Sequence, residues 1–130
     1  IPQGIELRIG KYHEMEFTPD IFACVLQYPN AAGNVEDYRA FVEKAHAANC
    51  KVAVAADILS LALLTPPGEW GADIVFGTTQ RLGTPMFYGG PSAAYFATRD
   101  EYKRNMLVER QIRQAVLPHG AANPRATYQA

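Results

Sequence analysis

Residues 51–57 read KVAVAAD and decide the fold predicted for this chain. A strand is predicted over Lys51–Ala56, because the small and β-branched residues that follow Lys51 are typical of a buried strand, and the polar residue Asp57 closes it. Two similar runs flank it in the sequence: residues 22–27, FACVLQ, and residues 72–76, ADIVF. Three such runs predict the centre of a sheet.

A helix is predicted between the first two strands, over residues 34–49. Asn34 is a suitable N-cap, and Glu36 and Asp37 place negative charge on the first turn. The apolar residues recur at helical spacing. They are Val35, Tyr38, Val42 and Ala45. Strand, helix, strand, connection and strand predict a parallel sheet with right-handed crossovers and covered faces.

The remaining segments extend this architecture. Residues 93–98 predict a fourth strand, which should be antiparallel because residues 81–91 are too few for a parallel crossover. A capping box at Thr98 and Glu101 predicts a helix to about Val116. The other expectations are a short strand at 5–9, a brief apolar helix or turn at 58–64, a domain spanning 1–117 and a disordered tail at 118–130. The fold class is therefore α/β, three-layered and mostly parallel, with an antiparallel strand near 93–98.

Composition excludes several classes of function. The chain has 130 residues, of which 48% are hydrophobic, enough for one domain with a core. A formal net charge of −1 argues against a nucleic-acid partner, and no apolar run approaches the length of a membrane span. No targeting segment is evident. Cys24 and Cys50 are expected to be reduced, buried thiols, and the three histidines lack metal-ligand spacing.

Polar residues follow each of the three predicted parallel strands. The carboxyl ends of parallel strands share one crevice, so these polar residues should lie side by side there. Asp57 could pair with a protonated ring nitrogen, or it could cap the turn that follows it. Arg81, beside Gln80, could bind a phosphate or carboxylate, or it could clamp Asp57. Asn30 could reach the crevice or only form its own turn.

Two long segments carry a family resemblance. Residues 64–104 read LTPPGEWGADIVFGTTQRLGTPMFYGGPSAAYFATRDEYKR, and residues 27–64 read QYPNAAGNVEDYRAFVEKAHAANCKVAVAADILSLALL. Together they closely resemble the glycine cleavage system P-protein, the pyridoxal-phosphate-dependent glycine decarboxylase. The resemblance covers roughly residues 21–106.

The resemblance implies a fold type I pyridoxal-phosphate architecture, of which this chain would be the central, incomplete part of the large domain. It also implies the reaction of the intact enzyme: decarboxylation of glycine and transfer of the aminomethyl group to the lipoyl arm of a carrier protein, the H-protein. The family is built from two homologous halves, so the lysine-bearing C-terminal half is an implied partner. Members work in the bacterial cytoplasm and in mitochondria.

The resemblance further implies which half this is. In the C-terminal half a His-Lys pair ends the strand that follows the Asp, whereas the matching positions here are Gln80 and Arg81. An arginine stays protonated and cannot form the imine that binds the cofactor. Asp57 occupies the position of the pyridine-nitrogen partner, and Gly89 and Gly90 that of a glycine-rich loop near the cofactor. We expect no catalytic residue in this N-terminal, lysine-lacking half and no pyridoxal phosphate bound by the chain alone.

The ends of the chain depart from the family pattern. The start at Ile1 without Met fits a piece of something longer, and the residues from Leu107 onward are unfamiliar. An incomplete sheet exposes edges and apolar faces, so self-association is expected. A stand-alone scaffold or assembly module with the same fold is the main alternative function. The chain does not have the further acidic residues and the Lys that a phospho-receiver domain needs. It also does not have the glycine-rich turn of a nicotinamide-dependent dehydrogenase.

Overall fold

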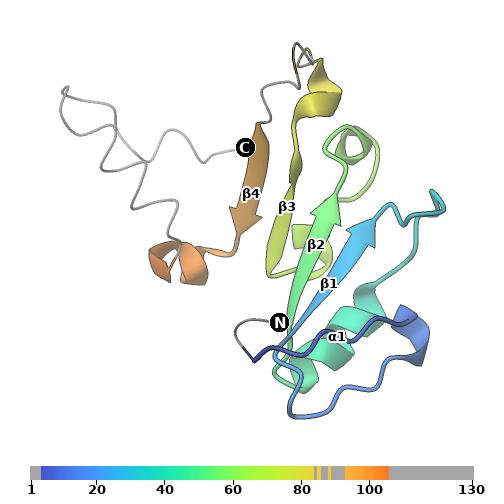
Figure 1. Cartoon of the computed structure of the whole chain (residues 1–130), viewed down its shortest axis with the longest axis vertical. Helices are drawn as coiled ribbons and strands as arrows, with labels where there is room; N and C mark the ends of the chain where they lie inside the picture. Colours follow the sequence, from blue (N-terminus) through green and yellow to red (C-terminus); the bar gives the residue numbers. More distant parts are fainter. Residues whose placement is uncertain (1–3, 84, 86–87, 89–92, 106–130) are drawn as a thin grey trace. The chain divides into compact units, whose positions relative to one another are not determined.

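The computed structural model describes residues 4–83, 85, 88 and 93–105. The chain divides into two compact units at Thr98 and Arg99. The first unit is built on a four-stranded sheet of order β1-β2-β3-β4 (Figure 1). The strands are β1 (Ala23–Tyr28), β2 (Lys51–Ala56), β3 (Ile74–Thr78) and β4 (Ala94–Thr98).

The first three strands are parallel and the fourth is antiparallel to β3, as predicted. The register places Tyr28 opposite Ala56 in the β1–β2 pair and Ala55 opposite Phe76 in the β2–β3 pair. Since the direction of β1, β2 and β3 is the same, their carboxyl ends lie along one edge of the sheet. The α/β, mostly parallel fold class is confirmed.

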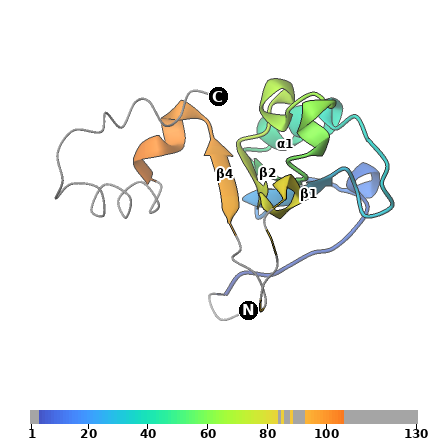
Figure 2. The ribbon, with the colours of Figure 1, turned by 90° about the horizontal axis from the view of Figure 1, so that it is seen from above.

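One face of the sheet packs against helix α1 (Arg39–Ala47), as Figure 2 shows from above. Alternate residues of β1 and β2 point into this layer, because successive side chains of a strand face opposite sides. Val42 on the helix is almost fully buried against them, and burying a side chain of this kind contributes about 1.5–3 kcal/mol. The core residues of these three elements are Cys24, Leu26, Tyr28, Phe41, Val42, Ala45, Val52, Val54 and Ala56.

The opposite face carries apolar side chains that remain accessible, with Val25 68% exposed and Phe96 45% exposed. Within the described residues, therefore, the fold has two of the three expected layers: the sheet and the α1 layer. The layer expected on the second face is not supplied by this part of the chain.

The helix begins later than predicted, at Arg39 rather than after Asn34. Asn30 explains the difference, because its backbone N–H donates to the carbonyl oxygen of Asn34 (3.0 Å) and its Oδ1 accepts the N–H of Asn34 (2.9 Å). The N–H and the carbonyl oxygen of Asn34 are both hydrogen-bonded to Asn30 in this turn, so the helix starts only after it. At the other end α1 stops as expected near Asn49, which has a left-handed φ of 57°.

Two further local predictions are wrong. Residues 5–9 form no strand; their alternating apolar residues are exposed, and Arg8 instead pairs with Glu6 and Asp20. Alternation alone cannot make a strand, which also needs a ladder partner. Thr98 caps no helix, since its hydroxyl donates to the carbonyl oxygen of Asp73 (3.0 Å).

Among the described residues of the first unit there are also four short 3-10 helices. They are η1 (Tyr12–Glu14), η2 (Ser60–Ala62), η3 (Pro67–Trp70) and η4 (Gln80–Leu82). Of these, η2 is the brief turn expected within residues 58–64. The described part of the second unit contains η5 (Asp100–Asn105). The rest of the helix expected to Val116, the boundary at residue 117 and the tail at 118–130 lie outside the described residues.

Candidate functional site

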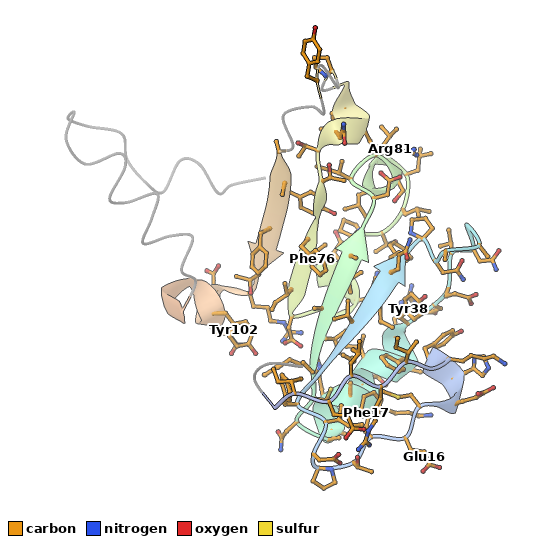
Figure 3. All side chains as sticks on the ribbon, in the orientation of Figure 1. Glu16, Phe17, Tyr38, Phe76, Arg81 and Tyr102 are labelled. Atoms are coloured by element: carbon orange, nitrogen blue, oxygen red, sulfur yellow. The ribbon has the colours of Figure 1, made fainter. Side chains whose placement is uncertain are left out.

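The edge formed by the carboxyl ends of β1, β2 and β3 brings Asp57 and Arg81 together. Asp57 directly follows β2, and Arg81 lies in η4, just after β3 (Figure 3). Nη2 of Arg81 is 3.1 Å from Oδ2 of Asp57. The Arg81 side chain is 64% exposed and that of Asp57 is 30% exposed, so this ion pair lies at the solvent-accessible carboxyl edge of the sheet. Of the two roles predicted for Arg81, binding a ligand or pairing with Asp57, the structure shows the pairing with Asp57.

Asp57 fulfils the capping role as well. Its second carboxylate oxygen, Oδ1, accepts the backbone N–H of Leu59 (3.0 Å), and its carbonyl oxygen accepts the N–H of Ser60 (3.1 Å) and the Ser60 hydroxyl (2.7 Å). Both carboxylate oxygens are thus engaged, one by the turn and one by Arg81. A carboxylate held in this way is oriented before any ligand arrives.

The segment around Arg81 is held by hydrogen bonds of its own. The hydroxyl of Thr78 accepts the backbone N–H of Gln80 (3.1 Å), and both the N–H and hydroxyl of Thr79 donate to the carbonyl oxygen of Ala93 (3.0 and 3.1 Å). These bonds turn the chain sharply after β3, which places Arg81 back over the strand ends. Gln80 lies in the same turn, and a ligand role for its side chain stays a prediction.

Of the three other predicted positions, one lies in a turn of its own and two lie outside the described residues. Asn30 forms its own turn: Oδ1 accepts the N–H groups of Ala32 and Asn34, while Nδ2 donates to Glu36 (3.4 Å). Gly89 and Gly90 are outside the described residues, so their role near a cofactor remains a prediction.

The structure adds a contact that sequence reasoning missed, between Tyr95 on β4 and the end of β2. The Tyr95 hydroxyl donates to the carbonyl oxygen of Ala56 (2.6 Å), one residue before Asp57. Burial raises the pKa of Tyr95, and the negative charge of Asp57 raises it further. A glycine within a strand beside an aromatic residue on the next strand, Gly77 with Tyr95, is the one signal that could have suggested such a crossing.

A second missed contact lies at the amino end of the sheet. Asp73 is 2% exposed, and its Oδ2 accepts the backbone N–H of Val52 (2.8 Å) and lies 2.8 Å from Nε2 of His46. This arrangement ties the end of α1 to β2 and to the start of β3. It is structural rather than part of the Asp57 site, since parallel strands place these two positions at opposite ends of β2.

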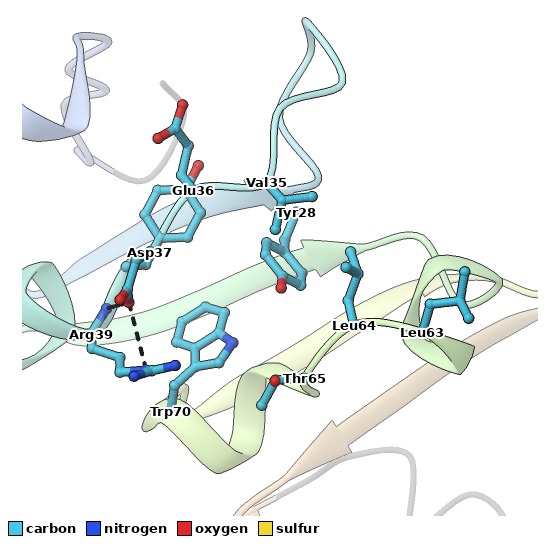
Figure 4. A pocket seen from close by; sticks show the side chains of 10 residues that line it. Tyr28, Val35, Glu36, Asp37, Arg39, Leu63, Leu64, Thr65 and Trp70 are labelled. Carbon is cyan, nitrogen blue, oxygen red and sulfur yellow. Dashed lines mark hydrogen bonds and ion pairs between the residues drawn. The ribbon is translucent and has the colours of Figure 1, made fainter.

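A separate hollow of about 290 Å³ lies beside the strand ends, where α1 begins (Figure 4). Its walls include the aromatic rings of Tyr28, Tyr38 and Trp70, whose centroids are 5.7 to 6.4 Å apart. Asp37 and Arg39 form an ion pair at its rim (3.6 Å). Neither Asp57 nor Arg81 lines it, so it is distinct from the site predicted at the crevice.

Other chemistry considered in the sequence finds little support in the described part of the chain. Cys24 and Cys50 are buried free thiols, and burial raises the pKa of Cys24 to about 12 and also raises that of Cys50. Thiols protonated at neutral pH are poor nucleophiles.

Among the described residues, no group of three or more His, Cys, Asp or Glu side chains could hold a metal ion. The same residues contain no helix that could span a membrane.

Comparisons with known proteins agree with one another. The family model "Glycine cleavage system P-protein" matches residues 1–112. Similar curated relatives are glycine dehydrogenases (decarboxylating) from Bacteroides fragilis, 87% identical over 106 residues, and Flavobacterium johnsoniae, 61% identical over 105 residues. A mitochondrial glycine dehydrogenase (decarboxylating) from Dictyostelium discoideum is 48% identical over 103 residues. These matches cover 82%, 81% and 79% of this chain, respectively.

A solved structure is similar as well. The crystal structure of a glycine decarboxylase (P-protein) of the glycine cleavage system, in inhibitor-bound form, aligns with a TM-score of 0.62 and 44% identity. The alignment covers 66% of this chain and 20% of that one. The chain spans 10 to 11% of the length of the curated relatives it matches.

Proposed function

Because this chain belongs to the glycine cleavage system P-protein family, we propose that it is part of a pyridoxal-phosphate-dependent glycine decarboxylase, in the half that lacks the cofactor-binding lysine. The intact enzyme would decarboxylate glycine and transfer the aminomethyl group to the lipoyl arm of the H-protein. In this proposal the chain contributes a folded scaffold at the junction of the two halves, and its site positions are non-catalytic. The setting would be the bacterial cytoplasm or the mitochondrion.

The ion pair between Asp57 and Arg81 is the observation that carries this proposal. Pyridoxal phosphate requires a neutral lysine amine at the strand end and a carboxylate directed toward its ring nitrogen. Here a guanidinium takes the place proposed for the amine, and its Nη2, 3.1 Å from Oδ2, engages that carboxylate. The negative charge of the Asp57 carboxylate is therefore paired with the guanidinium of Arg81 from the same chain.

The lysines of the chain support the same conclusion. Lys51 opens β2, at the opposite end from Asp57, while Lys44 is on α1 and Lys11 precedes η1. The fourth lysine of the sequence, Lys103, belongs to the second unit. The lysines of the first unit thus do not fit a cofactor linked through an amine beside Asp57, and we assign no reaction step to the described residues. The cofactor would be held by the C-terminal half.

Reconstitution tests the proposal. The chain is mixed with a separately produced C-terminal half, and exchange between glycine and labelled bicarbonate is measured with H-protein present. Exchange well above that of the C-terminal half alone supports a part in the enzyme. Absence of any increase, with both proteins folded, would instead favour an independent scaffold module.

A matched pair of variants sharpens this test. Leu63, 93% exposed, follows η2 on the connection that leaves the Asp57 end of β2, while Ile9, 90% exposed, lies in the N-terminal segment. If the strand-end edge meets the other half, Leu63→Glu should lower the restored exchange activity, whereas Ile9→Glu should not. Equal effects of the two substitutions would mean that this edge is not where the halves meet.

A further inference from the structure

We propose that Tyr95 is the positioning residue of the Asp57–Arg81 site, acting through the backbone of β2. The inference rests on the proposed function only in taking this ion pair as the occupant of the vacated lysine position. The physical claim concerns the pair itself: without the Tyr95 hydroxyl, the end of β2 would no longer direct Asp57 toward Arg81.

The path of the Tyr95 side chain is the first step. Tyr95 lies directly opposite Gly77 in the antiparallel β3–β4 pair, yet its hydroxyl donates to Ala56 on β2, one strand further away. The side chain therefore crosses β3 over Gly77. A Cβ atom at this glycine would lie 2.7 Å from Cε1 and 2.9 Å from the hydroxyl oxygen of Tyr95, and it would also collide with the Ala56 carbonyl oxygen. Glycine is thus required for the crossing.

The second step is what the hydroxyl holds. The carbonyl of Ala56 and the N–H of Asp57 belong to one planar peptide unit. Tyr95 donates to the carbonyl at 2.6 Å, and the N–H donates to the carbonyl oxygen of Tyr28 on β1 at 3.1 Å. The peptide unit is therefore hydrogen-bonded at both its carbonyl and its N–H. These two bonds fix the orientation of the peptide plane and with it the direction of the Asp57 side chain.

The third step is the effect on the ion pair. With its backbone fixed, Asp57 presents Oδ1 to the N–H of Leu59 and Oδ2 to Arg81. Arg81 is more than half exposed, so the arginine alone supplies little restraint, since long exposed side chains lose entropy on pairing. The ordered partner is Asp57, and Tyr95 is what orders its peptide. The negative charge of Asp57 in turn contributes to the raised pKa of Tyr95, so each group reports on the other.

The test uses the full chain and the ¹³Cγ resonance of Asp57. Arg81→Gln is introduced into three backgrounds, wild type, Tyr95→Phe and Tyr38→Phe, and the displacement of the Asp57 resonance is measured in each. Tyr38→Phe is the matched control, because the Tyr38 hydroxyl also donates to a strand carbonyl, that of Gln27 (3.4 Å). We expect the displacement to fall by about half or more in Tyr95→Phe alone, as expected for loss of a directing hydrogen bond. Equal displacements in all three backgrounds would overturn the proposal.

A second measurement applies even where Tyr95→Phe does not fold. The Tyr95 hydroxyl is titrated by ¹³Cζ resonance in wild type, in Asp57→Asn and in Asp37→Asn, the last being a carboxylate in the α1 region that pairs with Arg39. We expect Asp57→Asn to lower the pKa of Tyr95 and Asp37→Asn to leave it unchanged. An unchanged Tyr95 pKa in Asp57→Asn would overturn the proposal, because the hydroxyl would then not lie near the Asp57 carboxylate that it is proposed to position. Neither measurement involves the C-terminal half, so failed reconstitution would count against the proposed function alone.

Discussion

Oδ2 of Asp73 lies 2.8 Å from Nε2 of His46 and accepts the backbone N–H of Val52 at the same distance, in a position that is 2% exposed. A single carboxylate oxygen thus joins the last turn of α1 to the first half of β2. The cost of losing it follows from burial, because an N–H without a partner in the interior is unfavourable by about 1–3 kcal/mol.

Asp73→Ala is therefore expected to reduce the free energy of unfolding by about 2–4 kcal/mol, since it leaves the Val52 N–H and His46 without this acceptor. Asp73→Asn is the matched control, because its amide oxygen can still accept the Val52 N–H, and it should lose less. Urea denaturation of the three proteins measures the difference. Equal losses for Ala and Asn would show that the negative charge, not the acceptor, stabilises this end of the sheet.

Gly77→Ala is expected to destabilise the sheet by about 1–3 kcal/mol, as overpacking of a filled interior does. The new methyl group would collide with the carbonyl oxygen of Ala56 and with the ring of Tyr95. Gly68→Ala is the control, since a Cβ atom there meets nothing within 4 Å. Thermal unfolding should show a lower Tm for the first variant and little change for the second; similar Tm values for both would mean that β3 and β4 can separate freely.

The strands were predictable because each is made mostly of apolar residues, and β2 was predicted with its observed bounds. The closeness of Asp57 and Arg81 could be predicted from the sequence, since polar residues that follow neighbouring parallel strands meet at one edge of the sheet. The choice between a ligand contact and a clamp was not accessible, because it depends on side-chain direction within a short 3-10 turn. The start of α1 was misplaced because the hydrogen bonds of Asn30 to Asn34 overrule an otherwise suitable cap.

The contacts that sequence reasoning missed are those between distant residues. Tyr95 reaches Ala56 over 39 positions, and His46 reaches Asp73 over 27. Both depend on strand register, which is fixed by the whole sheet and not by any local pattern. Gly77, next to the last residue of β3, was the only local sign of the first contact.

The raised pKa of Cys24, about 12, makes stability fall at alkaline pH. Its ordinary value is 9, so between about pH 9 and 12 the unfolded chain releases a proton that the folded chain retains. Folding then loses at most about 1.4 kcal/mol for each pH unit from this group, whereas below pH 9 the contribution is constant. Cys24→Ala should flatten the decline in a series of denaturation curves between pH 8.5 and 10.5. An identical slope in the two proteins would assign the alkaline decline to other groups.

The open sheet face predicts self-association. Val25 lies on this face and is 68% exposed. Placing a charge there should oppose burial of the face between two copies, so Val25→Lys should shift the chain toward monomer. Light scattering after size exclusion measures the change, with Lys44→Glu on the exposed side of α1 as a charge-changing control. Unchanged association of Val25→Lys would exclude this face as the contact.

Finally, the engagement of Asp57 by Arg81 predicts that the chain does not bind pyridoxal phosphate specifically. With equimolar cofactor followed by borohydride, labelling of any of its four lysines should not exceed that of the same chain unfolded in urea, because no lysine among the described residues of the first unit lies beside Asp57, where an amine would be oriented. Peptide mapping by mass spectrometry measures the labelling. Arg81→Lys restores an amine beside Asp57 and serves as the positive comparison: a labelled Arg81→Lys protein with an unlabelled wild type would show that the guanidinium is what closes the site. Selective labelling of one native lysine in the folded wild type would contradict the assignment of this chain to the lysine-lacking half.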